Sequence, residues 1–196
     1  MKQSNGRQTD VHETWDESLI DLARICIRLD GLPLAIELCA PMVKVFSTKE
    51  IADRIEKSLD TIPRGLCDLP TRQQTIHGTI QWSYDLLEEN EKRLFKRLAI
   101  FNGGCTLDAV KVICEGGISG IIENILSALV NKNLVLAQER QDGEIHFGML
   151  ETIRRYGRNK LLVTKDADKL ADRHAEYYMK MAKRASLDLR GPDQIF

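Results

Sequence analysis

Few residues of this sequence are placed to do chemistry. The four histidines, His12, His77, His146 and His174, share no spacing typical of metal ligands. The chain has no G-x-x-x-x-G-K-[ST] loop, no G-x-S-x-G nucleophile motif and no recognisable pair of catalytic carboxylates. The sequence therefore predicts a protein that is not an enzyme on its own and that binds no metal.

One glycine-rich segment, residues 116–120 (GGISG), could in principle bind phosphate through its backbone. It contains no lysine and does not follow a predicted strand, whereas phosphate-binding loops have both features. A turn between two helices explains the same glycines, and we favour that interpretation.

The five cysteines are odd in number and show no C-x-x-C spacing, and most lie among apolar neighbours. They are Cys26, Cys39, Cys67, Cys105 and Cys114. Reduced thiols in the core of a cytosolic protein are the simplest interpretation. The N-terminus lacks an apolar signal core, and no apolar run is long enough to span a membrane, so we expect a cytoplasmic protein.

Composition limits the possible classes further. A chain of 196 residues can form one large domain or two small ones. It is 43% hydrophobic and 29% charged, with a formal net charge of −1. The near-neutral charge argues against a general nucleic-acid binder and leaves local basic patches open.

The elements expected in the first third of the chain are helices. Apolar residues at helical spacing predict a first helix that ends at Asp30-Gly31, and its expected buried residues are Leu19, Leu22, Ala23, Cys26 and Leu29. Pro33 suits the first turn of the next helix, and Pro41 should end or kink it. Ser47 and Glu50 form a capping-box pattern at the start of a third helix.

The segment 62–70 (IPRGLCDLP) is the expected domain boundary. A helix opening at Thr71 and another containing Leu94, Phe95 and Leu98 follow it. Thr106 can cap a short helix that runs to Cys114, and Ser119 can cap another helix after it. The segment 134–150 then predicts a β-hairpin that turns at Asp142-Gly143. Three helices followed by a two-stranded wing are typical of a winged-helix domain.

The last two expected helices cover residues 151–162 and 166–185. The predicted fold class is therefore mainly α: a helical subdomain, a winged-helix domain with one β-hairpin, and a further helix. The expected ranges are a disordered N-terminus at 1–17, the helical subdomain at 18–62, the winged-helix domain at 70–163, and the start of a TPR-like helical region at 164–196.

Four stretches carry a resemblance to a known family. They are RLDGLPLAIELCA, LPTRQQTIHGTIQWSYDLLEENEKRLFKRLAIFNGGCTLDAV, LVNKNLVLAQE and HFGMLETIRRYG, in this order. The set resembles the bacterial STAND-type ATPase regulators with NB-ARC-like domains, which are often fused to LuxR-type or SARP-type DNA-binding domains and to TPR arrays. The resemblance runs from about residue 18 to 194 and covers only the helical GLPL subdomain, the winged-helix domain and the segment leading to a TPR array.

The resemblance implies a role for the GLPL turn. In the family this turn packs against the adenine end of the nucleotide, which would assign that contact to Gly31, Leu32, Pro33 and Leu34. Without a nucleotide-binding core, a simple helix-linking turn explains the same residues. We therefore expect no cofactor for this chain alone, and ATP or ADP only where a nucleotide-binding core is present.

A second implied site lies after the predicted hairpin. Relatives carry Met-His-Asp there, and the histidine senses the β-phosphate; the matching residues are Met149, Leu150 and Glu151. Leucine cannot donate a hydrogen bond to phosphate, so the role we expect for these three residues is in a hinge or in packing. Glu151 could cap the next helix or pair with an arginine.

A winged helix also suggests binding to DNA. The candidate recognition helix, residues 120–132, has only Glu123 and Lys132 as charged residues, whereas phosphate contacts need lysine or arginine. Two basic clusters occur elsewhere, in residues 92–97 and in the set Arg154, Arg155, Arg158 and Lys160. Each can be a DNA-binding or docking surface, or a solvated helix face.

The leading hypothesis is a non-catalytic regulatory module of a STAND-type signalling ATPase or transcriptional regulator. Its expected partners are a nucleotide-binding core and a TPR-like sensor, with no membrane contact. The alternatives are a free-standing winged-helix DNA-binding transcription regulator and a truncated gene product.

Overall fold

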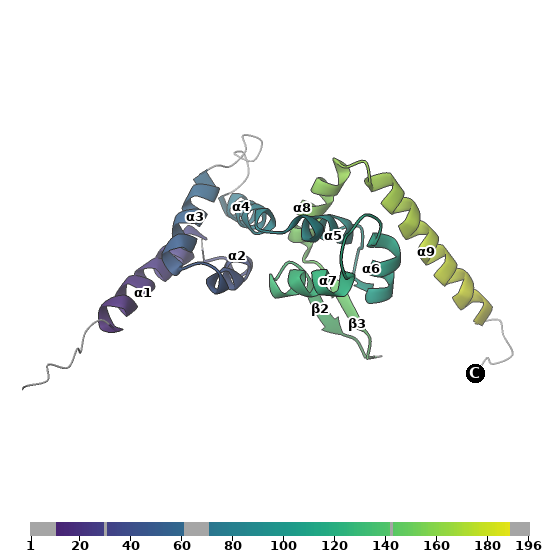
Figure 1. The fold of residues 1–196 in the computed structure, drawn as a ribbon, viewed down its shortest axis with the longest axis horizontal. Helices are drawn as coiled ribbons and strands as arrows, with labels where there is room; N and C mark the ends of the chain where they lie inside the picture. The colour runs from purple at the N-terminus through teal and green to yellow at the C-terminus, as the bar shows by residue number, and fades with distance from the viewer. Residues whose placement is uncertain (1–10, 30, 61–70, 142, 189–196) are drawn as a thin grey trace, which may run out of the picture. The chain divides into compact units, whose positions relative to one another are not determined.

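The computed structural model describes residues 11–29, 31–60, 71–141 and 143–188 (Figure 1). The chain divides into two compact units, Met1–Asp85 and Leu86–Phe196. The elements, in chain order, are α1 (Val11–Arg28), α2 (Pro33–Cys39), the 3₁₀ helix η1 (Ala40–Lys44), α3 (Thr48–Asp60), α4 (Thr71–Asp85), α5 (Glu89–Leu98), β1 (Cys105–Thr106), α6 (Leu107–Cys114), α7 (Ile122–Asn131), β2 (Leu136–Glu139), β3 (Ile145–Gly148), α8 (Glu151–Leu162) and α9 (Ala167–Asp188).

In the first unit, α1 packs on α3, and α4 packs on both α2 and α3. The predicted helix ends are confirmed at two places. The α-helical turns of α2 stop at Cys39 and continue as the 3₁₀ helix that contains Pro41. The Ser47–Glu50 capping box forms, because the Ser47 N–H donates to Glu50 Oε2 (2.9 Å) and the Glu50 N–H donates to Ser47 Oγ (3.3 Å).

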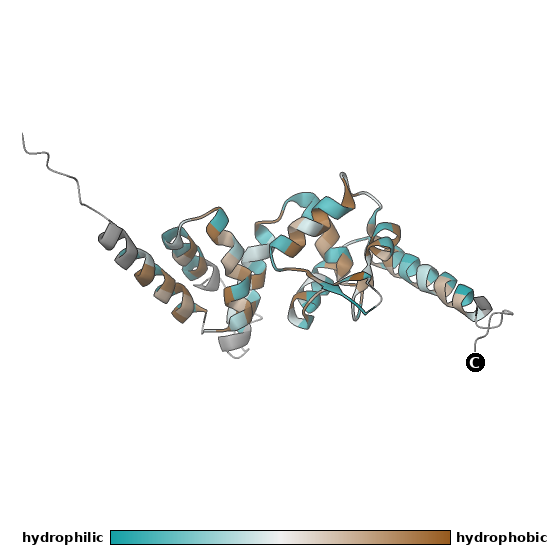
Figure 2. Ribbon diagram, turned by 90° about the horizontal axis from the view of Figure 1, so that it is seen from below, coloured by the Kyte–Doolittle hydropathy of each residue, from teal (hydrophilic) through white to brown (hydrophobic). Residues whose placement is uncertain are grey.

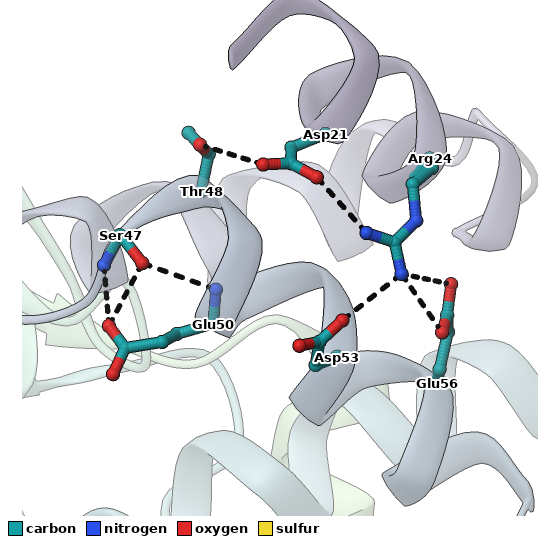
Figure 3. A network of polar contacts seen from close by, with 7 residues as sticks. All are labelled: Asp21, Arg24, Ser47, Thr48, Glu50, Asp53 and Glu56. Carbon is teal, nitrogen blue, oxygen red and sulfur yellow. Dashed lines mark hydrogen bonds and ion pairs between the residues drawn. The ribbon is translucent and has the colours of Figure 1, made fainter. Parts of the chain in front are cut away.

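The contact between α1 and α3 includes a network of polar side chains (Figure 3). The Arg24 guanidinium donates to Asp21 of its own helix (3.0 Å) and to Asp53 and Glu56 of α3 (both 3.1 Å). These hydrogen bonds raise the pKa of Arg24, and the one with Asp53 contributes most to the increase. Several apolar side chains elsewhere on α1 are exposed.

The expected buried face of α1 is therefore wrong in part. Ile25 and Leu29 are buried, but Leu19, Leu22, Ala23 and Cys26 are exposed. Figure 2 shows hydrophobic residues along the described part of α1. Because this helix is apolar around most of its circumference, periodicity alone does not indicate which part meets a neighbour.

The second unit has the winged-helix order, with α5, β1, α6 and α7 followed by the hairpin β2–β3 (Figure 1). Its antiparallel sheet has the order β1-β3-β2, with Cys105 opposite Phe147 and Ala137 also opposite Phe147. The hairpin confirms the prediction, whereas β1 did not emerge from the sequence. The core is formed by buried apolar residues of α5, α6, α7 and α8, including Phe95, Ile113, Leu129 and Ile153.

Four local predictions can be compared with the structure of this unit. Thr106 Oγ1 accepts the Ala109 N–H (3.2 Å) and caps α6, as expected. Ser119 does not cap α7, which begins only at Ile122 with no side-chain cap. The helix from 151 to 162 has the expected bounds, and α9 extends slightly beyond the expected 166–185.

The compact units also bear on the expected ranges. The helix α4 packs within the first unit, although the sequence grouped it with the winged-helix domain from residue 70. Helix α1 begins at Val11, inside the range expected to be disordered. Asp142 of the predicted hairpin turn, residues 61–70 with the predicted domain boundary, and the residues after 188 lie outside the described residues.

Candidate functional site

The helix in the recognition position, α7, buries Ile122, Leu126 and Leu129 against the unit. Its exposed face carries Asn124, Ser127 and Asn131, preceded by Ile121, whose side chain is 61% exposed. This face has no lysine or arginine, so it offers polar groups that could meet base edges but no cation for phosphate.

The charged residues at the two ends of α7 are paired within the unit. Glu123 accepts a hydrogen bond from Lys111 of α6, with 2.6 Å between Oε1 and Nζ, and this pair lowers the pKa of Glu123 and raises that of Lys111. Lys132 lies 2.6 Å from the buried Glu91 of α5. A phosphate would have to compete with a carboxylate for either lysine.

The hairpin β2–β3 adds no clear positive charge to this surface. Arg140 is exposed at its tip beside the exposed carboxylates of Glu139 and Glu144. Glu144 also lies 3.6 Å from Nε2 of His146. A wing that contacts DNA needs cations toward the backbone, and here acidic side chains balance the arginine.

The basic set on α8 divides into residues held by the fold and residues facing solvent. Arg154 pairs with Glu151, with its Nε 2.8 Å from Oε2, and Lys160 Nζ lies 5.2 Å from the ring centroid of Tyr156. Arg155 and Arg158 are exposed. These two arginines are therefore the part of the predicted surface best placed to meet an anionic partner.

The expected hinge, Met149 to Glu151, links β3 to α8. Met149 is half-buried, and Leu150 stands at the N-cap of α8 without a side-chain hydrogen bond. Glu151 begins the helix and pairs with Arg154, which holds the pKa of its carboxyl below the usual value. Of the two roles predicted for Glu151, the arginine pair is the one observed; a hinge role stays a prediction.

The GLPL turn lies between α1 and α2. Gly31 has a left-handed backbone (φ +61°) and its N–H donates to Cys26 O (2.9 Å), which ends α1. Pro33 is exposed at the first position of α2, and Leu32 and Leu34 are half-buried. The geometry explains Gly31 and Pro33 as helix-ending and helix-starting residues, and the adenine contact stays a prediction.

Sequence reasoning missed a group on α5 that holds the turn between α6 and α7. Asn90, Arg93 and Arg97 lie on one face of α5, and all three make hydrogen bonds to the backbone of residues 114–119. Arg97 is only 9% exposed, although the sequence placed it in a basic cluster that was expected to form a solvated helix face or a docking surface. The available signal was the spacing of these residues by three and four positions.

A groove of about 480 Å³ lies between α9 and the start of α6. Its wall includes a row of rings in which the centroid of His174 lies 5.4 Å from that of Phe101 and 4.8 Å from that of Tyr178. Burial lowers the pKa of His174, which favours its neutral form.

Within the described part of the chain, no group of three or more potential ligands could hold a metal ion.

The thiols can be assigned an expected reactivity. Burial raises the pKa of Cys39, Cys105 and Cys114 to about 12 each, whereas Cys26 is exposed, contrary to the expected core position. At pH 8 we expect iodoacetamide to modify the exposed Cys26 far faster than these three buried thiols, because the thiolate is the nucleophile and burial disfavours it. Peptide mass spectrometry of the native protein measures this; modification of Cys105 at the rate of Cys26 would contradict the assigned burial. Cys67 lies outside the described residues.

Comparison with known families identifies a domain in this region. Residues 87–162 match a family model described as a winged helix-turn-helix domain. Together with the observed order of helices and strands, this match shows that the second unit contains a winged helix-turn-helix domain. The match begins near the start of α5 and ends at the last residue of α8.

Two groups of curated mycobacterial proteins are similar to the chain. The "Putative HTH-type transcriptional regulator Rv0890c" of Mycobacterium tuberculosis (strain ATCC 25618 / H37Rv) is 41% identical over 163 residues, which cover 82% of this chain and 18% of that protein. Its counterpart in Mycobacterium bovis, Mb0914c, gives the same values. "Uncharacterized protein Rv0894" of M. tuberculosis is 30% identical over 166 residues, or 82% of this chain and 42% of its own length.

The chain thus spans less than half the length of these curated relatives. No solved structure matches it. Among the described helices, none combines the length and the apolar character needed to cross a membrane.

Proposed function

We propose that this chain is a non-catalytic part of a transcriptional regulator, and that its winged helix-turn-helix domain acts by contacting protein. The domain itself and the similarity to proteins named as HTH-type transcriptional regulators support the regulatory role.

The observation that carries the docking role is the exposed face of α7. Asn124, Ser127 and Asn131 carry no charge, and Lys111 and Lys132 are held by glutamates. Non-specific DNA affinity comes almost wholly from cations that displace counterions along the phosphates. A recognition helix without them is better suited to a protein surface.

Within such a regulator, the partners we propose are those that the sequence resemblance implies, a nucleotide-binding core and a TPR-like sensor. In this view the chain couples the nucleotide state of the core to the sensor, as in STAND-type proteins. The support is the ordered set of motifs and the exposed Pro33 of the GLPL turn.

The second candidate is direct DNA binding by this domain. Two observations favour it: the winged helix-turn-helix match, and the exposed Arg155 and Arg158 on α8. These arginines could contact phosphate even though α7 lacks cations.

Fluorescence anisotropy with a labelled random-sequence duplex, at 50–300 mM salt, separates the two candidates. For docking, we expect a dissociation constant weaker than about 100 µM at 150 mM salt, which is the weak limit of non-specific binders. A constant below about 1 µM, with a log–log salt slope steeper than about −4, would reject docking and establish DNA binding.

A double variant, Arg155→Gln with Arg158→Gln, serves as the matched control. If the chain does bind DNA through α8, the variant should reduce the magnitude of the salt slope by about 1.8, since each phosphate contact contributes about 0.9. An unchanged slope would place the DNA contact elsewhere in the domain.

A further inference from the structure

The turn between α6 and α7 is held by side chains of α5. The Arg97 guanidinium donates through Nη1 to Cys114 O (2.6 Å) and to Gly116 O, and Arg93 Nη1 donates to Gly117 O (2.7 Å). On the far side of the turn, the Ser119 N–H donates to Asn90 Oδ1 (3.3 Å). We call Asn90, Arg93 and Arg97 the turn clamp.

The turn clamp replaces a capping motif. The last carbonyl groups of a helix have no partner within the helix. Here the Cys114 carbonyl at the end of α6 and the Gly116 and Gly117 carbonyls of the turn accept arginine N–H groups. Arginine can do this because one rigid, planar guanidinium offers five donors. Arg97, with a side chain only 10% exposed, is the inner member of the clamp.

The same guanidinium also contacts the start of α9. Its Nη2 donates to Asp166 Oδ2 (3.0 Å), and Asp166 O accepts the Leu170 N–H of the first turn of α9 (2.9 Å). Arg97 holds the pKa of Asp166 below its usual value, so the carboxylate is charged at neutral pH. One side chain therefore joins three elements: α5, the α6–α7 turn and α9.

A second contact between α9 and the turn does not depend on Asp166. Arg173 of α9 lies so close to Gly116 that a Cβ built there would stand 2.7 Å from Arg173 Nη1. Helix α9 also packs on α6, and its C-terminal part extends away from that helix (Figure 1). The turn that precedes α7 is thus contacted by side chains of both α5 and α9.

We propose that Arg97 couples α9 to the α6–α7 turn, so that a displacement of α9 changes the order of the turn and of the first residues of α7. A guanidinium that binds Asp166 and two carbonyl oxygens at once cannot follow α9 without loosening the carbonyl contacts. The regulatory meaning of this coupling rests on the proposed function, because α7 carries the face assigned to docking.

Hydrogen–deuterium exchange of the full chain tests the coupling with two matched variants. Asp166→Asn removes the ion pair, and Asp168→Asn removes an equal charge two residues further along, in the first turn of α9. We expect Asp166→Asn to raise exchange in residues 115–124 by about two- to fivefold, the range of a half-exposed ion pair. Asp168→Asn should change exchange in α9 only.

The outcomes decide the proposal without reference to any partner. Faster exchange confined to α9 in Asp166→Asn, or equal changes at 115–124 in both variants, would overturn it. Arg97→Lys gives a second test, because lysine cannot make the forked contact. In that background Asp166→Asn should have no further effect at 115–124; an undiminished effect would show a route other than Arg97 and reject the proposal. Since DNA or protein binding is not the readout, failure here is distinct from failure of the proposed function.

Discussion

Gly157→Val is expected to destabilise the winged-helix unit by about 3 kcal/mol, at the upper end for an overpacked core. Gly157 is buried where α8 crosses α5, and a Cβ built there would lie 3.0 Å from Ala99 Cβ and 3.3 Å from Phe95 Cε1. The obstacles are a short side chain and a fully buried ring, and neither can move aside. Valine adds two further methyl groups at this crossing, so the helices must separate.

The loss of stability is measured by urea denaturation, with hydrogen exchange in α5 and α8 as the probe of unfolding. Both tryptophans, Trp15 and Trp82, lie in the first unit, so tryptophan fluorescence would report mainly on that unit and not on the winged-helix unit. Asn159→Val, at an exposed position of α8, controls for the low helix propensity of valine. If both variants lose the same stability, the close crossing at Gly157 has no energetic role.

The second large effect is expected from Glu91→Gln, at about 1–3 kcal/mol for loss of a buried, charged hydrogen-bond partner. Glu91 Oε2 accepts the Glu88 N–H at the start of α5 (2.7 Å) and lies 2.6 Å from Lys132 Nζ just after α7. Glutamine keeps the shape but loses the charge that pairs with Lys132. The variant should therefore loosen both the start of α5 and the end of α7.

Glu89→Gln is the matched control for this variant. Glu89 lies two residues earlier, is 71% exposed, and stands 3.9 Å from Arg93, so its removal should change stability by less than about 0.5 kcal/mol. The same urea series measures both. Equal effects of the two variants would mean that Glu91 contributes only its charge near the helix N-terminus and not its contact with Lys132.

Features that depend on neighbouring residues were predictable from the sequence alone. The Ser47–Glu50 capping box, the Thr106 cap, the end of α2 before Pro41 and the β2–β3 hairpin all form as predicted. Each depends on hydrogen bonds or dihedral preferences within a few residues. The absence of cations on the exposed face of α7 also followed from the sequence, because almost every residue of that helix is uncharged.

The tertiary structure decided which faces are covered and which charges are paired. The sequence could not show that α1 meets α3 through Arg24 rather than through Leu19 and Leu22, because both arcs of the helix are compatible with burial. It placed Arg97 in a solvated or docking cluster, whereas the fold buries this arginine against carbonyl oxygens 17 and 19 positions away and a carboxylate 69 positions away. Ser119 lies before the start of α7 at Ile122, and its N–H donates to Asn90 Oδ1, 29 positions away. In each case the deciding partner is distant in sequence, and such partners meet only when the helices have packed.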